Sequence, residues 1–108
     1  MAPLDPGRLL REFRDGLEAI YSARFRDLYL YGSYARDEAD RESDIDILVV
    51  LDRIQHYGAE IDRTSELVAG LSLAHGISVS RVFVREEDWL RGDNPFLRHV
   101  RKEARVVA

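Results

Sequence analysis

SDIDILVVL, residues 43–51, is the most strand-like segment of this chain. Every residue after Asp46 in this segment is apolar, and most are β-branched. A strand that is covered on one face alternates apolar and polar residues, whereas a strand that is covered on both faces is apolar throughout. We therefore expect residues 45–51 to form a strand that is covered on both faces.

Segments typical of helices and strands alternate on either side of this strand. The expected elements are a helix over about residues 6–21 with Asp5 as its N-cap, a strand over 27–31, a polar loop over 32–43, a helix from residue 53 or 57 to 75 with Gly76 as its C-cap, a strand over 77–84, a helical turn over 86–90, and a helix from Pro95 with Asn94 as its N-cap. Three strands interleaved with helices predict an α/β (α+β) fold, in which helices pack on a small mixed β-sheet of three or more strands.

The length and composition limit the class of protein. The chain has 108 residues, and we expect residues 1–108 to form a single domain. It contains no cysteine, which excludes disulfide bonds and cysteine-based metal sites. No apolar stretch is long enough to span a membrane, and the N-terminus lacks the basic and apolar regions of a signal peptide. We therefore expect a cytoplasmic protein.

The negative charge of the chain lies in one segment. The chain carries 20 acidic and 16 basic residues, a formal net charge of −4, and residues 36–46 alone carry six acids and two bases. The rest of the chain is electrically balanced, so it lacks the net basic surface that direct DNA binding usually requires. A local acidic cluster is typical of a solvated loop or of a cation site.

Asp44 and Asp46 lie at the start of the central strand. Residues two apart on a strand point to the same face, so both carboxylates converge on one small volume. Two like charges at close range repel each other, and a bound cation removes this repulsion. Oxygen ligands alone suit magnesium, which keeps waters and phosphate oxygens in its shell.

Gly32 and Ser33 directly follow the preceding strand. A glycine at this place lets the backbone approach a phosphate closely, and the next backbone amides, together with the Ser33 hydroxyl, can bind an anion. If the two strands are neighbours, this phosphate cradle meets the carboxylate pair. A nucleoside triphosphate with magnesium then fits, with magnesium bridging the phosphates to Asp44 and Asp46.

The combination is specific. Gly-Ser at 32–33, ten residues, and Asp-x-Asp at 44–46 resembles the signature of the polymerase-beta nucleotidyltransferase superfamily. With Arg36 and Ser43 in register, residues 29–50 are similar to the minimal nucleotidyltransferases of prokaryotes, which are the antitoxin partners of HEPN-domain toxins.

The resemblance implies a polymerase-beta-like fold and a magnesium-dependent transfer of AMP from ATP to a hydroxyl of a partner protein. In the characterised antitoxins, the acceptor is a tyrosine of the cognate HEPN toxin. The site residues that it implies are Asp44 and Asp46 as catalytic metal ligands, Gly32 and Ser33 for the triphosphate, and Arg36 and Ser43 as further nucleotide-binding candidates.

Two positions depart from the family pattern. Asp37 stands where the family usually has a glycine after Ala-Arg, and Ser80 stands where many members carry a third carboxylate. In the superfamily, that carboxylate is the candidate that accepts the proton of the acceptor hydroxyl. A serine is not a general base of the same kind.

Several hypotheses remain open. The chain transfers AMP with two carboxylates, or Glu86 or Glu87 replaces the missing one, or the chain neutralises its toxin by binding alone. Transfer to a small molecule is a further alternative, although the chain is short for such an enzyme unless a homo-oligomer supplies the substrate surface.

Overall fold

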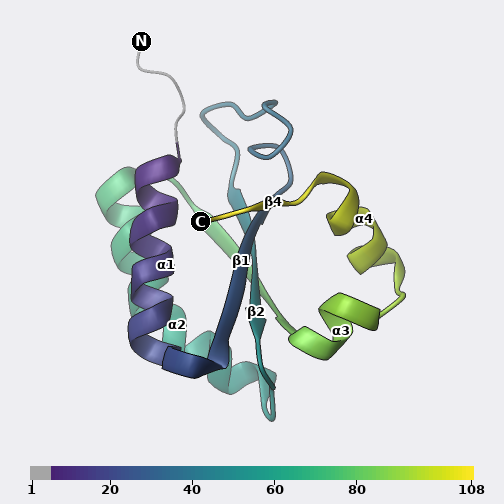
Figure 1. Cartoon of the computed structure of the whole chain (residues 1–108). Coiled ribbons are helices and arrows are strands. Elements are labelled where there is room, and N and C mark those ends of the chain that lie inside the picture. Colours follow the sequence, from purple (N-terminus) through teal and green to yellow (C-terminus); the bar gives the residue numbers. More distant parts are fainter. Residues whose placement is uncertain (1–5) are drawn as a thin grey trace.

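The central strand organises the structure. In the computed structural model, which describes residues 6–108, β2 lies inside a four-stranded sheet of order β3-β2-β1-β4 (Figure 1). β1 pairs with β2 and β4 in antiparallel directions, and β3 runs parallel to β2. The strands are β1 (Phe25–Tyr31), β2 (Ile45–Leu51), β3 (Val79–Arg85) and β4 (Arg105–Val106). The mixed sheet agrees with the expected fold class.

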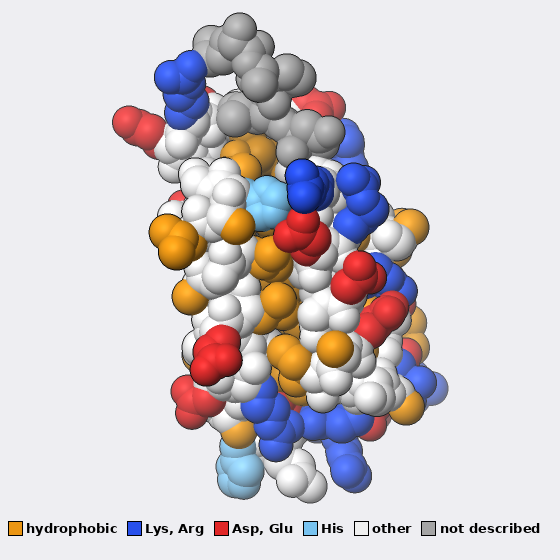
Figure 2. Space-filling view, turned by 90° about the vertical axis from the view of Figure 1, so that its left-hand side faces the viewer, with side chains coloured by type: hydrophobic (Ala, Val, Ile, Leu, Met, Phe, Trp, Pro, Cys, Tyr) orange, Lys and Arg blue, Asp and Glu red, His pale blue; other side chains and the backbone are white. Residues whose placement is uncertain are grey.

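Helices cover both faces of the sheet (Figure 1). The helices are α1 (Gly7–Tyr21), α2 (Tyr57–His75), α3 (Glu86–Arg91) and α4 (Pro95–Glu103), with a 3₁₀ turn η1 (Ser22–Arg24) before β1. α1 and α2 lie on one face, and hydrophobic side chains line the seam between them (Figure 2). α3 and α4 lie on the other face. None of the helices within residues 6–108 is long and apolar enough to cross a membrane.

β2 contributes side chains to both layers, as its sequence predicts. Ile47 and Val49 pack in the cluster that includes α1 and α2, whereas Leu48 and Val50 pack in the cluster beneath α3 and α4. All four are at most 1% exposed. Asp46 lies two and four residues before Leu48 and Val50 on the same strand, so its carboxylate lies on the same face, the α3–α4 face.

Most predicted boundaries are correct within two residues, and the differences have local causes. β3 begins at Val79 and not at residue 77, because Gly76 ends α2 in the left-handed region and the Ile77 amide still bonds to the Ser72 carbonyl. The expected N-cap Asp5 lies outside the described residues, and α1 begins after Pro6. Asn94 caps α4 as expected, with its Oδ1 accepting the Leu97 amide at 2.8 Å.

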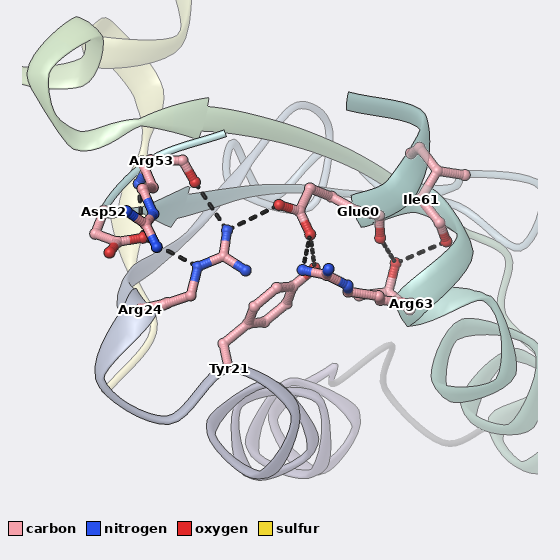
Figure 3. A network of polar contacts seen from close by, with 8 residues as sticks. Tyr21, Arg24, Asp52, Arg53, Glu60, Ile61 and Arg63 are labelled. Carbon is pink, nitrogen blue, oxygen red and sulfur yellow. Dashed lines mark hydrogen bonds and ion pairs between the residues drawn. The ribbon is translucent and has the colours of Figure 1, made fainter. Parts of the chain in front are cut away.

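A buried carboxylate joins α1, η1 and α2 at the end of the sheet where β1 begins (Figure 3). Glu60 on α2 is only 2% exposed, and its oxygens accept from the Tyr21 hydroxyl at 3.1 Å and from the guanidiniums of Arg24 at 2.9 Å and Arg63 at 3.1 Å. A buried charge is tolerated when it is paired and hydrogen-bonded in this way.

We expect Glu60→Gln to lower the free energy of unfolding by about 2 kcal/mol, because the amide keeps the shape but leaves Arg24 without its buried counter-charge. Urea denaturation measures the difference. The matched control is Glu66→Gln on the exposed side of the same helix, for which little change is expected. Equal stability of the two variants would contradict a structural role for Glu60.

Candidate active site

The ends of β1 and β2 meet beside Gly32. The antiparallel register pairs Tyr31 with Asp46, so Gly32 follows directly next to the Asp46 carboxylate. Gly32 has φ +77°, and a Cβ atom built on it would overlap Oδ2 of Asp46. Both the backbone angle and the close approach therefore require glycine at this position. The structure brings the predicted phosphate cradle and the predicted carboxylate pair together.

Asp44 and Asp46 supply two carboxylates at the start of β2. Asp44 is exposed just before the strand, and Asp46 is half-buried. Burial raises the pKa of Asp46 above its ordinary value, the Asp44 carboxylate raises it further, and Arg36 opposes the shift. Within residues 6–108, neither carboxylate has a hydrogen bond or ion pair. A charged, partly desolvated and unpaired carboxylate beside a second one is a donor set that fits a divalent cation.

The described residues contain no group of three side chains that could hold a metal ion. The protein therefore offers two carboxylates, and a cation held here would take its other ligands from water or from a bound phosphate. This is the usual way in which proteins hold magnesium.

Residues 32–38 form a tight turn after β1. The Ala35 and Arg36 amides both donate to the Gly32 carbonyl, at 3.0 and 3.2 Å, and the Glu38 amide donates to the Ser33 carbonyl at 2.9 Å. The turn leaves the Ser33 and Tyr34 amides without an acceptor in the described part of the chain. These amides and the Ser33 hydroxyl are the donors that a phosphate needs.

Asp37 has φ +58° in this turn. This left-handed conformation is the one that glycine adopts without strain, and aspartate is among the few other residues that tolerate it. The conformation would suit the glycine of the family pattern described above, and Asp37 is able to adopt it.

Arg36 and Ser43 have different surroundings. The Arg36 guanidinium is paired with two carboxylates: its Nη1 donates to Glu103 at 2.8 Å and its Nε donates to Glu38 at 3.2 Å. The Ser43 hydroxyl accepts from the Asp40 amide at 2.9 Å and donates to the Asp40 carboxylate at 3.2 Å. Ser43 therefore closes a turn in the loop, and its contact with a nucleotide stays a prediction.

Glu103 is the residue of this region that the sequence did not reveal. It ends α4, and its carboxylate also accepts the Gly32 amide at 2.9 Å. One local signal was present, because an acid in the last turn of a helix opposes the helix dipole and needs another partner. Nothing in the sequence identified that partner, which is 71 positions away.

Ser80 occupies the position next to Asp46 on β3. The parallel register pairs Asp46 with Ser80, so both side chains point to the α3–α4 face. On the other side of Asp46 lies Tyr31, which is no base at neutral pH even at the ordinary pKa of a tyrosine, and burial raises its pKa further, to about 12. No base therefore flanks Asp46 on either neighbouring strand.

The hypothesis that Glu86 or Glu87 replaces the missing carboxylate is wrong. Both residues begin α3 after the far end of β3, six or more residues beyond Ser80. At about 3.3 Å per residue, this separation is roughly 20 Å. Glu86 lies instead 3.9 Å from the guanidinium of Arg26 at the opposite end of the sheet.

We expect Asp46→Asn to raise the melting temperature of the metal-free protein at neutral pH. A pKa that is raised in the folded state means that the charged form destabilises folding, so the contribution of Asp46 to stability is lost as pH rises through its folded-state pKa. An increase of a few degrees corresponds to about 0.5–1 kcal/mol in a domain of this size.

Thermal unfolding followed by circular dichroism, from pH 3 to pH 8, measures this effect. The difference between Asp46→Asn and the unmodified protein should vanish below about pH 4, where the aspartate is itself protonated. A stabilisation that persists at pH 3 would contradict the electrostatic explanation.

Comparison with known proteins identifies relatives of the whole chain. The sequence profile of the nucleotidyltransferase domain family matches residues 10–106. A protein of Methanocaldococcus jannaschii that carries the provisional name protein adenylyltransferase MJ0604 is 34% identical over 101 residues, which cover 93% of this chain and 95% of that protein.

Solved structures share the fold. A chain in the crystal structure of a toxin-antitoxin with AMP-PNP superposes with a TM-score of 0.65 at 23% identity, over 92% of this chain and 72% of that one. A chain in the complex of a tri-AMPylated Shewanella oneidensis HEPN toxin with its MNT antitoxin gives a TM-score of 0.61 at 20% identity, over 96% and 72%.

Proposed function

This chain belongs to the nucleotidyltransferase domain family, and from that membership we propose that it transfers AMP from ATP to a hydroxyl of a partner HEPN-domain toxin and acts as its antitoxin. The observation that supports the proposal is the close approach of Gly32 to the Asp46 carboxylate, which brings the predicted phosphate cradle next to the predicted cation ligands. The acceptor is a protein in this proposal because the chain resembles a protein adenylyltransferase along nearly its whole length.

The proposed roles follow from the chemistry of the side chains. The Ser33 and Tyr34 amides, the Ser33 hydroxyl and the Arg36 guanidinium bind the triphosphate. Asp44 and Asp46 would hold magnesium, which when bound would neutralise charge on the phosphate oxygens. The acceptor oxygen forms a bond to the α-phosphorus while the bond to the bridging oxygen breaks, and pyrophosphate leaves. The proton of the acceptor hydroxyl passes to water or to the partner, since Ser80 does not accept it.

The partner and the acceptor residue are inferred from relatives. One structural neighbour is an AMPylated HEPN toxin bound to an MNT antitoxin, and another is a toxin-antitoxin with the ATP analogue AMP-PNP. We propose a tyrosine of the HEPN toxin as the acceptor. The second candidate function is neutralisation by complex formation alone, and the observation that favours it is the serine beside Asp46.

The test combines calorimetry with mass spectrometry. We expect magnesium-dependent binding of ATP by the purified chain, and, after incubation with ATP, magnesium and a HEPN-domain protein that forms a complex with this chain, a mass gain of that protein by one or more AMP units less water. ATP binding without any mass gain would leave the nucleotide site standing and favour neutralisation by binding. An absence of ATP binding would refute the proposed site.

A further inference from the structure

The C-terminal end of α4 lies near the loop that follows β1 (Figure 1), and its last residue contacts the turn that forms the proposed triphosphate cradle. Its last residue, Glu103, has a side chain that is only 12% exposed. One carboxylate oxygen accepts the Gly32 amide at 2.9 Å, and the other accepts Nη1 of Arg36 at 2.8 Å. A single carboxylate therefore links the end of β1, the turn that follows it and α4.

These bonds hold Arg36 in one orientation. Its Nε donates to Glu38 and its Nη1 donates to Glu103, so two carboxylates hold two corners of the planar guanidinium. No bond from Nη2 is present among residues 6–108. A guanidinium fixed at two corners presents the third to an anion with less loss of side-chain freedom.

Glu103 remains ionised in this setting. The hydrogen bond from Arg36 lowers the pKa of its carboxyl most strongly, and the Gly32 amide lowers it further. An ion pair adds to this connection. The guanidinium of Arg105, which follows α4, lies 3.4 Å from the Asp37 carboxylate in the same turn. The C-terminal segment thus holds the turn at three points.

We propose that Glu103 is the positioning residue of the triphosphate cradle, which orients Arg36 and the Gly32 backbone so that nucleotide phosphates bind beside Asp46. This inference rests on the proposed function. Glu103 does not take the place of the phosphate, because the Ser33 and Tyr34 amides, the Ser33 hydroxyl and the Nη2 corner remain available. It is not the missing general base either, since it lies on the β1 side of Asp46 and Ser80 lies on the β3 side.

The experiment compares Glu103→Ala, Glu103→Gln and Glu38→Ala by calorimetric titration with ATP and magnesium. We expect Glu103→Ala to weaken ATP binding about tenfold or more, the range found when supporting partners of a binding site are removed. Glu103→Gln should recover part of the loss, because its amide oxygen still accepts the Gly32 amide. Glu38→Ala is the matched control, since among residues 6–108 the Glu38 carboxylate bonds to Arg36 alone and its side chain is 65% exposed, and we expect a smaller effect.

A double-mutant cycle separates positioning from general stability. If Glu103 acts largely through Arg36, Glu103→Ala should add little to the loss caused by Arg36→Ala alone. In transfer assays, Glu103→Ala should raise KM for ATP and leave kcat nearly unchanged. The Gly32 amide resonance in a ¹⁵N spectrum should move in Glu103→Ala and stay in place in Glu38→Ala.

The outcomes are distinct. Equal or tighter ATP binding by Glu103→Ala, in a folded variant, overturns the inference and identifies Glu103 as a competitor of the phosphates or as a bystander. Full additivity with Arg36→Ala, together with an unmoved Gly32 amide resonance in Glu103→Ala, overturns it as well. If the unmodified chain binds no ATP, the proposed function fails and the inference fails with it, whereas the two former results leave the proposed function intact.

Discussion

Replacing Asp44 and Asp46 together by asparagine should abolish magnesium-dependent ATP binding and reduce AMP transfer by at least about 1,000-fold. Removal of a single group that stabilises transition-state charge usually costs 10²–10³ in rate, and here both proposed cation ligands are removed. Asparagine keeps the size and hydrogen-bonding ability of aspartate, so the change isolates the negative charge. Calorimetry and the mass assay with the partner protein measure the two losses separately.

The matched control for the double variant is Glu42→Gln. Glu42 is an exposed acid in the same loop, so the variant lowers the local negative charge without touching the pair at the start of β2. We expect it to bind ATP normally. The melting temperature of the double variant, measured by circular dichroism, separates a loss of function from unfolding. Transfer that persists in the double variant would refute the assignment of the two aspartates.

The same variant decides between the two candidate functions. If toxin neutralisation in cells persists when AMP transfer is lost, complex formation is sufficient and the chemistry is dispensable. If neutralisation and transfer are lost together, the modification of the toxin is the mechanism. Complex formation itself, measured by co-purification, should survive in either case, because the substitutions change charge at one end of the sheet and leave the core intact.

The parts of the fold that were predictable are those with a strong local signal. β2 was predicted with the boundaries that the structure has, because an uninterrupted apolar segment is typical of a strand covered on both faces. α4 was predicted from Asn94-Pro95, since the side chain caps the helix and proline suits its first turn. β4 was missed, because two residues carry no periodicity. The antiparallel pairing with β1 and the bond from the Val107 amide to the Leu28 carbonyl hold it in place.

The residues of the candidate site also fall into those that the sequence predicted and those that it did not. Gly32 and Asp46 lie at the ends of consecutive strands, so the sequence alone showed that they meet if those strands pair. The position of Ser80 was also predictable, because the resemblance to the family identified the residue that the parallel register places beside Asp46. The contact of Glu103 with Gly32 and Arg36 depends on where the last helix packs, and no local pattern encodes that packing. Glu86 and Glu87 were proposed because they follow Ser80 closely in the sequence. The hypothesis failed because β3 carries the chain to the opposite end of the sheet before these residues are reached.

Ser80→Asp should raise the rate of AMP transfer by about 100-fold or more, because a positioned general base typically contributes 10²–10⁴. The parallel register supports this expectation, since residue 80 lies beside Asp46 on the same face of the sheet and its side chain is exposed. The new carboxylate would stand where the acceptor hydroxyl must lose its proton. Single-turnover assays with saturating ATP and the HEPN-domain partner measure the chemical step directly.

The matched control is Ser80→Asn, which has the same size but no basic oxygen, and we expect no gain from it. Ser80→Asp should also lower the melting temperature of the metal-free protein, because a third carboxylate adds repulsion at a site where burial and then the Asp44 charge already raise the pKa of Asp46, and magnesium should reverse this loss. If magnesium restores the stability but transfer does not increase, the site binds its cation and proton removal does not limit the reaction. In that case Ser80 does not limit the rate of AMP transfer, and the partner protein or water already takes the proton.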